Sequence, residues 1–144
     1  MAQKLGEICQ EGQYNYQRLM QRQDIYGASL MVHSFEEHVM ELLYLINGVY
    51  APHRKWMVTE AAKLAKGEKI LDGVKSLMGK IPDTASYQTR EQIDWIGTTN
   101  KEDEVLMAIN EIAAEIGKLL REEGYTRSSA LYLEQQIPYI LQLA

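Results

Sequence analysis

The stretch that decides the fold is residues 25–50, IYGASLMVHSFEEHVMELLYLINGVY. Its apolar residues recur at helical spacing and cover most of the helix circumference, which is typical of a helix at the centre of a bundle. Asp24 stands just before it as an N-cap residue. At about 1.5 Å per residue, roughly 26 residues give a helix about 39 Å long. We therefore expect a long central helix over Ile25–Tyr50.

Two lines of polar residues run along the surface of this helix. One is spaced 4, 4 and 3 and predicts an exposed edge that faces solvent or a partner; it consists of His33, Glu37, Glu41 and Tyr44. The other lies on an apolar face and includes Glu36 and Asn47. Because a buried carboxylate and a buried amide need partners, either Arg18 or Lys55 is expected to neutralise Glu36, or Glu36 contacts a ligand. Asn47 is expected either to hold the backbone at residues 50–53 or to contact a ligand.

The segment behind the helix, residues 51–56, reads Ala-Pro-His-Arg-Lys-Trp. Pro52 disfavours a helical conformation at the residue before it, so the central helix must break here. Tyr50, His53 and Lys55 then stand at the break, where Lys55 is placed to reach a phosphate or an acidic partner. Trp56 is expected to be a core anchor, although ligand contact is the alternative.

The rest of the chain also shows helical periodicity and no strand alternation. Further helices are expected at 2–22 (irregular at Gly12), 54–66, 68–78, 86–96, 101–123 and 128–143, the last one bent near Pro138. The prediction is therefore an all-α fold: a helical bundle of about five to six helices around a long central helix, forming a single domain over 1–144.

Composition narrows the range of functions. A net charge of −5 argues against general nucleic-acid binding. Cys9 is the only cysteine, which excludes an intrachain disulfide and a Cys-based zinc site. No signal peptide pattern and no long apolar run is present, so we expect a cytoplasmic protein with no membrane association.

Motifs for known chemistry are absent from the sequence. There is no P-loop, no dinucleotide fingerprint and no nucleophile elbow. The Glu-x-x-His pairs of di-iron bundles are missing as well. We therefore expect no catalytic residue, no metal site and no cofactor.

A second polar and aromatic cluster lies in the first helix. Tyr14, Arg18 and Arg22 are spaced four residues apart and share one face, with Asn15 beside them. Arg binds carboxylates and phosphates through its planar fork, so this face is a candidate groove. The alternative is a tyrosine that packs against arginine side chains at the helix surface.

Three segments carry a resemblance to a known family. They are Gln13-Tyr14-Asn15-Tyr16, then Leu45–Pro52 (LINGVYAP) with Lys55-Trp56, and Gly124-Tyr125 with Tyr132-Leu133-Glu134. They resemble a helical family of unknown function that usually sits C-terminal to a nucleotidyltransferase catalytic module. The resemblance implies a bundle like the substrate-binding domains that accompany small nucleotidyltransferases.

The catalytic module of that family uses a Gly-Ser turn and an Asp-x-Asp pair, and this chain has no Asp-x-Asp. The resemblance therefore implies a non-catalytic module that contributes to substrate or nucleotide binding, with a nucleotidyltransferase catalytic module in cis or in trans. The expected binding residues are Tyr14, Asn15, Arg18, Glu36, Asn47, Tyr50, His53, Lys55 and Trp56. The alternative is a dimeric protein-interaction bundle, an accessory or antitoxin-like partner with no small-molecule site.

Overall fold

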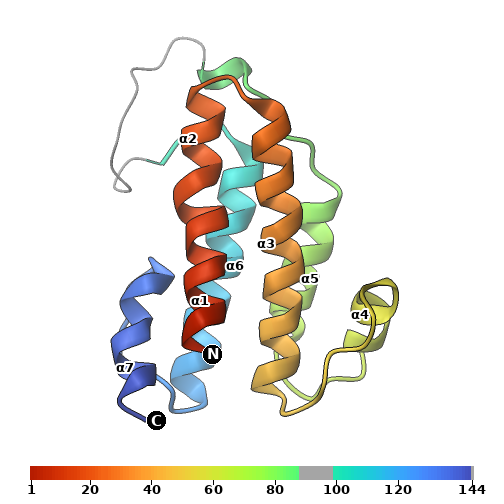
Figure 1. The fold of residues 1–144 in the computed structure, drawn as a ribbon, viewed down its shortest axis with the longest axis vertical. Coiled ribbons are helices and arrows are strands. Elements are labelled where there is room, and N and C mark those ends of the chain that lie inside the picture. The colour runs from red at the N-terminus through yellow and green to blue at the C-terminus, as the bar shows by residue number, and fades with distance from the viewer. Residues whose placement is uncertain (88–98, 144) are drawn as a thin grey trace.

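The computed structural model describes residues 1–87 and 99–143 and shows a bundle of helices (Figure 1). No strand occurs within those two ranges. The expected all-α helical bundle is confirmed. Its elements in chain order are α1 (Ala2–Ile8), the π-helix η1 (Cys9–Asn15), α2 (Tyr16–Gln21), α3 (Ile25–Ile46), α4 (Arg54–Ala61), α5 (Glu68–Met78), the 3-10 turn η2 (Ala85–Tyr87), α6 (Glu104–Glu122), the 3-10 helix η3 (Leu133–Gln136) and α7 (Ile137–Leu141).

The central place of α3 in the bundle is confirmed. The segments α1, η1 and α2 follow one another as a single rod, and α3 returns antiparallel beside it (Figure 1). α3 also packs against α4 and α5, while α6 packs against α5, η1 and η3. α4 lies to the side of the C-terminal part of α3, and α7 lies on the other side of the bundle, against α1. None of the helices in the described ranges is long and apolar enough to cross a membrane.

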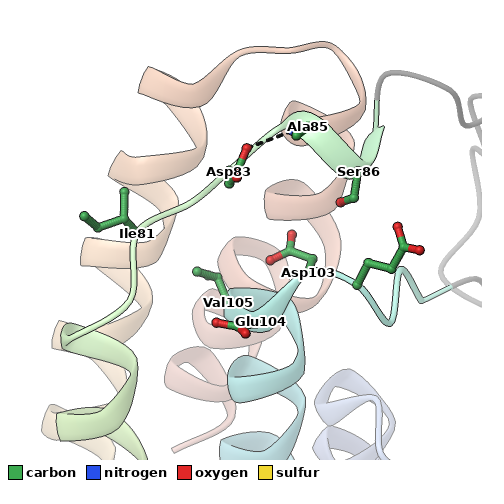
Figure 2. Close-up of a pocket in the computed structure, with 8 residues that line it drawn as sticks. Ile81, Asp83, Ala85, Ser86, Asp103, Glu104 and Val105 are labelled. Atoms are coloured by element: carbon green, nitrogen blue, oxygen red, sulfur yellow. Dashed lines mark hydrogen bonds between the residues drawn. The ribbon is translucent and has the colours of Figure 1, made fainter.

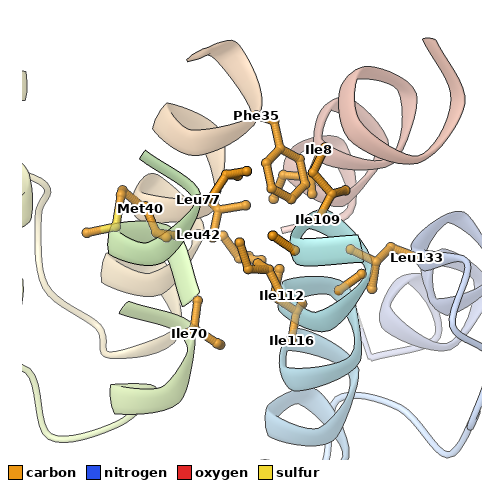
Figure 3. Close-up of a cluster of buried hydrophobic side chains, with 14 of the residues drawn as sticks. Ile8, Phe35, Met40, Leu42, Ile70, Leu77, Ile109, Ile112, Ile116 and Leu133 are labelled. Atoms are coloured by element: carbon orange, nitrogen blue, oxygen red, sulfur yellow. The ribbon is translucent and has the colours of Figure 1, made fainter. Parts of the chain in front are cut away.

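A continuous apolar core holds these helices together (Figure 3). Phe35 of α3 and Ile109, Ile112 and Ile116 of α6 are all almost completely buried. Burial of one such side chain contributes about 1.5–3 kcal/mol. The apolar stripes read from the sequence on α3 and α6 therefore do form the core.

The irregularity expected at Gly12 is confirmed as well. Gly12 lies in the middle of η1 and is buried against the ring of Phe35. A Cβ atom at Gly12 would stand 2.4 Å from Cδ2 of Phe35 and 3.0 Å from Cγ2 of Ile109. Because glycine has no Cβ atom, the rod formed by α1, η1 and α2 (the first rod) can pack closely against α3 and α6.

The predicted end of the central helix at Tyr50 is wrong, because α3 ends at Ile46. Gly48 takes a left-handed conformation with φ of 68°. The backbone N–H of Val49 then donates to the carbonyl of Tyr44 at 3.1 Å, which closes a glycine-based C-cap. Residues 47–53 therefore form a corner, outside the helix, before α4 begins.

Two further helix boundaries differ from the prediction. α4 stops at Ala61 rather than near residue 66, and α6 starts at Glu104 rather than at residue 101. The start of α6 is fixed by Asp103, whose carboxylate accepts from the N–H of Leu106 at 3.1 Å. The expected helix at 86–96 falls almost wholly on residues 88–98, outside the described residues; its first two positions belong to η2.

The single helix predicted over 128–143 is wrong over its first five residues, 128–132. Helical structure starts only at Leu133. The buried Gln136 side chain donates from Nε2 to the carbonyl of Ala130 at 2.9 Å, and Gln13 donates from Nε2 to the carbonyl of Leu131, also at 2.9 Å. Carbonyls bound by side chains in this way are not paired within a helix, so this stretch runs as a loop.

Candidate functional site

An open pocket of about 470 Å³ lies at the corner between α3 and α4. Its walls come from α3, from the break at residues 51–53, from the start of α4 and from α1. The lining residues are Lys4, Glu37, Glu41, Leu45, Ala51, Pro52, His53, Arg54 and Met57. We call this hollow the corner pocket. Five residues of the segment 45–56 that was singled out in the sequence thus line one pocket.

Two ion pairs line the corner pocket. Lys4 Nζ lies 2.5 Å from Glu41 Oε2, and Arg54 Nη2 lies 2.9 Å from Glu37 Oε1. Burial alone would lower the pKa of Lys4, yet its hydrogen bonds to Glu41 and Glu7 raise it overall. The pocket therefore offers two cations and two carboxylates side by side, which suits a ligand that carries groups of both signs.

Several residues of the corner segment 45–56 that do not line the pocket are exposed and partly apolar. Tyr50 is 99% exposed, and Val49 is half-exposed beside it. Trp56 is 52% exposed, so the expectation that it is a core anchor is wrong. Lys55 Nζ lies 5.2 Å from the centroid of the Trp56 ring, within cation–π range. Trp56 stays outside the core because it lies in the first turn of α4, on a short helix that buries only Met57 and Ala61.

Two of the expected binding residues stabilise the corner itself. His53 is the N-cap of α4, and its Nδ1 accepts from the N–H of Lys55 at 3.3 Å. Asn47 donates to the carbonyls of Leu43 and Lys66 at 2.8 and 3.1 Å and accepts from the N–H of Lys66 at 3.0 Å. Asn47 was expected to hold the backbone at residues 50–53; it holds Lys66 instead, because the chain passes the end of α3 a second time just before α5.

Glu36 is buried on α3, and its partner is a neighbour on the same helix. Its Oε1 lies 3.1 Å from His33 Nδ1, and its Oε2 has no hydrogen-bond partner. The expectation that Arg18 or Lys55 neutralises Glu36 is therefore wrong. Burial raises the pKa of the Glu36 carboxyl above 4.5, and the contact with His33 opposes that rise.

Replacing Glu36 by methionine is expected to raise the free energy of unfolding at neutral pH by about 1–3 kcal/mol, because a buried oxygen without a partner is removed. A raised pKa in the folded state means that Glu36 is tolerated best below pH 4.5 and destabilises the fold as the pH rises through its folded pKa. Urea unfolding across this pH range should therefore show a weaker pH dependence in Glu36→Met. Glu111→Met, at an exposed carboxylate of α6, is the control and should change neither quantity.

The other expected cluster lies elsewhere in the bundle. Arg18 Nη1 donates to the hydroxyl of Tyr14 at 2.9 Å, and its guanidinium carbon lies 4.9 Å from the centre of the Tyr14 ring. This arrangement agrees with packing at the helix surface. Tyr14 is roughly 15 Å along the rod from Lys4 of the corner pocket, and Asn15 adjoins it at the end of η1. The nine expected residues thus do not form one groove.

The polar edge predicted on α3 is only partly present. His33 is exposed, and Glu37 and Glu41 face the corner pocket. Tyr44 is buried, and its hydroxyl donates to the carbonyl of Met57 at 2.7 Å. Placing Tyr44 on this edge was therefore wrong, because the fold lays α4 over that side of α3.

A pocket that the sequence did not reveal lies at the start of α6 (Figure 2). It measures about 400 Å³, and most of its polar groups are acidic. Its polar lining consists of Asp83, Ser86, Glu102, Asp103 and Glu104. These residues come from η2 and its approach and from the start of α6, so only the tertiary fold brings them together. The sequence contains one local sign of this pocket: Asp103 follows a turn and precedes an apolar stripe.

Asp103 is buried beneath this pocket between two tyrosines. Its Oδ2 accepts from the hydroxyl of Tyr16 at 2.9 Å and from that of Tyr87 at 2.6 Å. Burial, followed by the charge of Asp103, raises the pKa of Tyr16, so its hydroxyl stays protonated and donates. Asp103 therefore joins α2, η2 and α6 at one point.

A third polar group lies along the seam between the first rod and α3. His38 Nδ1 lies 2.8 Å from Glu11 Oε1, and His38 Nε2 lies 3.6 Å from Glu7 Oε2. The imidazole thus stands between two carboxylates. Among residues 1–87 and 99–143, no set of three or more His, Cys, Asp or Glu side chains has the geometry to hold a metal ion.

Comparison with known proteins gives one match. No curated protein and no solved structure matches the chain. Residues 1–57 match the family model described as a domain of unknown function (DUF4037), which confirms the expected resemblance to a family of unknown function. Over residues 1–57, the part that forms α1 to α3 and lines the corner pocket, the protein is thus similar to this domain of unknown function.

Proposed function

We propose that this chain is a non-catalytic helical module that works in the cytoplasm beside a nucleotidyltransferase catalytic module, in cis or in trans. The corner pocket contributes to binding the acceptor substrate or the nucleotide. The exposed residues around it, above all Tyr50, contact the catalytic module. The chain itself has no Asp-x-Asp pair with which to hold a nucleotide and its magnesium.

One observation carries this proposal. The segment that resembles nucleotidyltransferase-linked bundles folds into a corner that lines a pocket with two ion pairs, and Tyr50 and Trp56 of the same segment are exposed. Tyrosine and tryptophan are enriched among the residues that dominate binding energy at interfaces. Exposed aromatic residues in the same segment as a charged pocket suit a substrate that is enclosed between two modules.

A second candidate function is a dimeric protein-interaction bundle. It is favoured by Tyr26 and Leu30, which lie one turn apart at the start of α3 and are 85% and 65% exposed. His33 continues this face by another turn. A homodimer would bury these three side chains at the end of α3 opposite to the corner.

The variants Tyr50→Ala and Tyr26→Ala distinguish the two proposed functions. Each removes an exposed tyrosine side chain and leaves no cavity in the core. The first proposal expects Tyr50→Ala to weaken binding to a catalytic module that carries the Gly-Ser turn and Asp-x-Asp pair by at least tenfold, measured by titration calorimetry. Tyr26→Ala should leave that binding unchanged. The dimer hypothesis expects the reverse: a concentration-dependent mass by light scattering that Tyr26→Ala removes.

Ligand binding at the corner pocket is tested with Mg·ATP and with an aminoglycoside as probes. We expect a thermal shift with at least one of them, reduced in Glu41→Gln and unchanged in Glu111→Gln. Asn47→Ala should lower the melting temperature but keep the affinity at a temperature where it is folded, because Asn47 bonds only to backbone. No shift with either probe, together with no binding to a catalytic module, would overturn the proposal.

A further inference from the structure

A separate hollow of about 230 Å³ lies where the loop after α6 meets α7. It shares no lining residue with the corner pocket and lies outside residues 1–57. Its distinctive side chains are two tyrosines, an arginine and an amide. They are Tyr125, Arg127, Tyr139 and Gln142. We call it the α7 hollow.

The loop side of the α7 hollow is held in place from beneath. The Thr126 hydroxyl donates to Gln136 Oε1 at 2.5 Å and accepts from the N–H of Ser128 at 3.1 Å. Both Thr126 and Gln136 are buried. Tyr125 and Arg127 flank the inward-pointing Thr126, and both line the hollow. These hydrogen bonds hold the backbone from which Tyr125 and Arg127 extend.

The other side comes from α7 and its C-cap residue. Tyr139 and the C-cap residue Gln142 are three residues apart and both line the hollow, while Ile140 is buried in the core. Tyr139 lines the hollow and keeps 38% of its surface exposed. Within the described ranges, Arg127 is exposed and has no hydrogen bond or ion pair. An arginine without a partner therefore lines the same hollow as two tyrosines.

We propose that the α7 hollow binds a small anion with one aromatic ring, in which the flat ring stacks on a tyrosine and a carboxylate or phosphate pairs with Arg127. The guanidinium is planar and carries donors in a fork that fits either anion. Stacking on an aromatic ring contributes about 1–3 kcal/mol per base in nucleic-acid complexes. The volume is below the ~300–1,000 Å³ of sites for drug-sized ligands, which favours a single ring.

Two probe pairs test this proposal and distinguish the two anions: benzoate with benzamide, and uridine monophosphate with uridine. Titrations of the full chain followed by ¹H–¹⁵N NMR should shift the amide signals of residues 125–127. We expect at least one anion to bind at least tenfold more tightly than its neutral partner. Benzoate as the better ligand indicates a carboxylate site, and uridine monophosphate a phosphate site.

Substitutions at Arg127 and Tyr139 test whether these side chains bind the anion. Arg127→Gln should weaken the bound anion at least tenfold, and Tyr139→Leu should weaken both members of its pair. Both side chains are exposed, so the melting temperature should stay within the range of the control, Arg22→Gln, at an exposed arginine after α2. Signals that do not shift with either anion, neutral probes that bind as tightly, or unchanged affinity in Arg127→Gln would each overturn the proposal. Failure at this hollow leaves the corner pocket untouched, since no residue is shared.

Discussion

Replacing Asp103 by alanine is expected to lower the free energy of unfolding by about 3–5 kcal/mol. The carboxylate caps α6 through the N–H of Leu106 and accepts from the hydroxyls of Tyr16 and Tyr87. Loss of an N-cap costs about 1 kcal/mol. The buried Tyr16 hydroxyl left without its partner costs about 1–3 kcal/mol, and loss of the hydrogen bond from Tyr87 costs about 1 kcal/mol. Urea unfolding followed by far-ultraviolet circular dichroism measures the change.

Asp24→Ala is the matched control for this variant. Asp24 is also an N-cap aspartate, but it is exposed and caps α3 only through the N–H of Gly27 at 2.9 Å. It is expected to cost about 1 kcal/mol. Equal losses in the two variants would show that Asp103 acts as an ordinary cap and that its bonds to the tyrosines contribute nothing.

The parts of the fold that the sequence predicted rest on local signals. The capping aspartate and the apolar stripe placed α3, and glycines at both ends bounded α5, whose predicted range Glu68–Met78 is the observed one. Gly12 was a sign of irregularity because glycine weakens a regular helix. Each of these signals acts within a few residues of the structure it fixes.

The errors have a common physical cause, which is competition from distant side chains. Residues 128–132 have helical periodicity, but Gln13, more than a hundred residues away, binds the backbone there. Tyr44 has the spacing of an exposed edge, yet α4 folds back and offers it the carbonyl of Met57. Such contacts depend on how the helices meet, which periodicity alone does not contain.

The candidate site was predictable in its place but not in its chemistry. The Pro52 break and the polar residues around it are local features of the sequence, and they marked the corner. The ion pairs of the pocket depend on Lys4, and no spacing or motif connects Lys4 with Glu41. Asn47 and His53 proved to be occupied by backbone groups, so the exposed residues Tyr50 and Lys55 are the better candidates for contact with a ligand or partner.

Gly12→Ala is expected to destabilise the protein by about 1–3 kcal/mol, the usual range for an overpacked core. The added methyl would stand 2.4 and 2.7 Å from two carbons of the Phe35 ring, which is itself enclosed by the core. Neither the ring nor η1 can move away without opening contacts between the first rod and α3. Thermal and urea unfolding of the purified variant measure the loss.

Gly6→Ala, about two turns earlier in the same rod, is the control, because a methyl there meets only Cδ1 of Ile137 at 3.8 Å. Alanine is favoured over glycine inside a helix by about 1 kcal/mol, so this variant should be as stable as the original chain or more stable. The two substitutions are chemically identical and should differ by about 2–4 kcal/mol, with opposite signs. If Gly12→Ala also stabilises, the close approach of η1 to Phe35 is not what requires glycine at position 12, and the π-helix must have another cause.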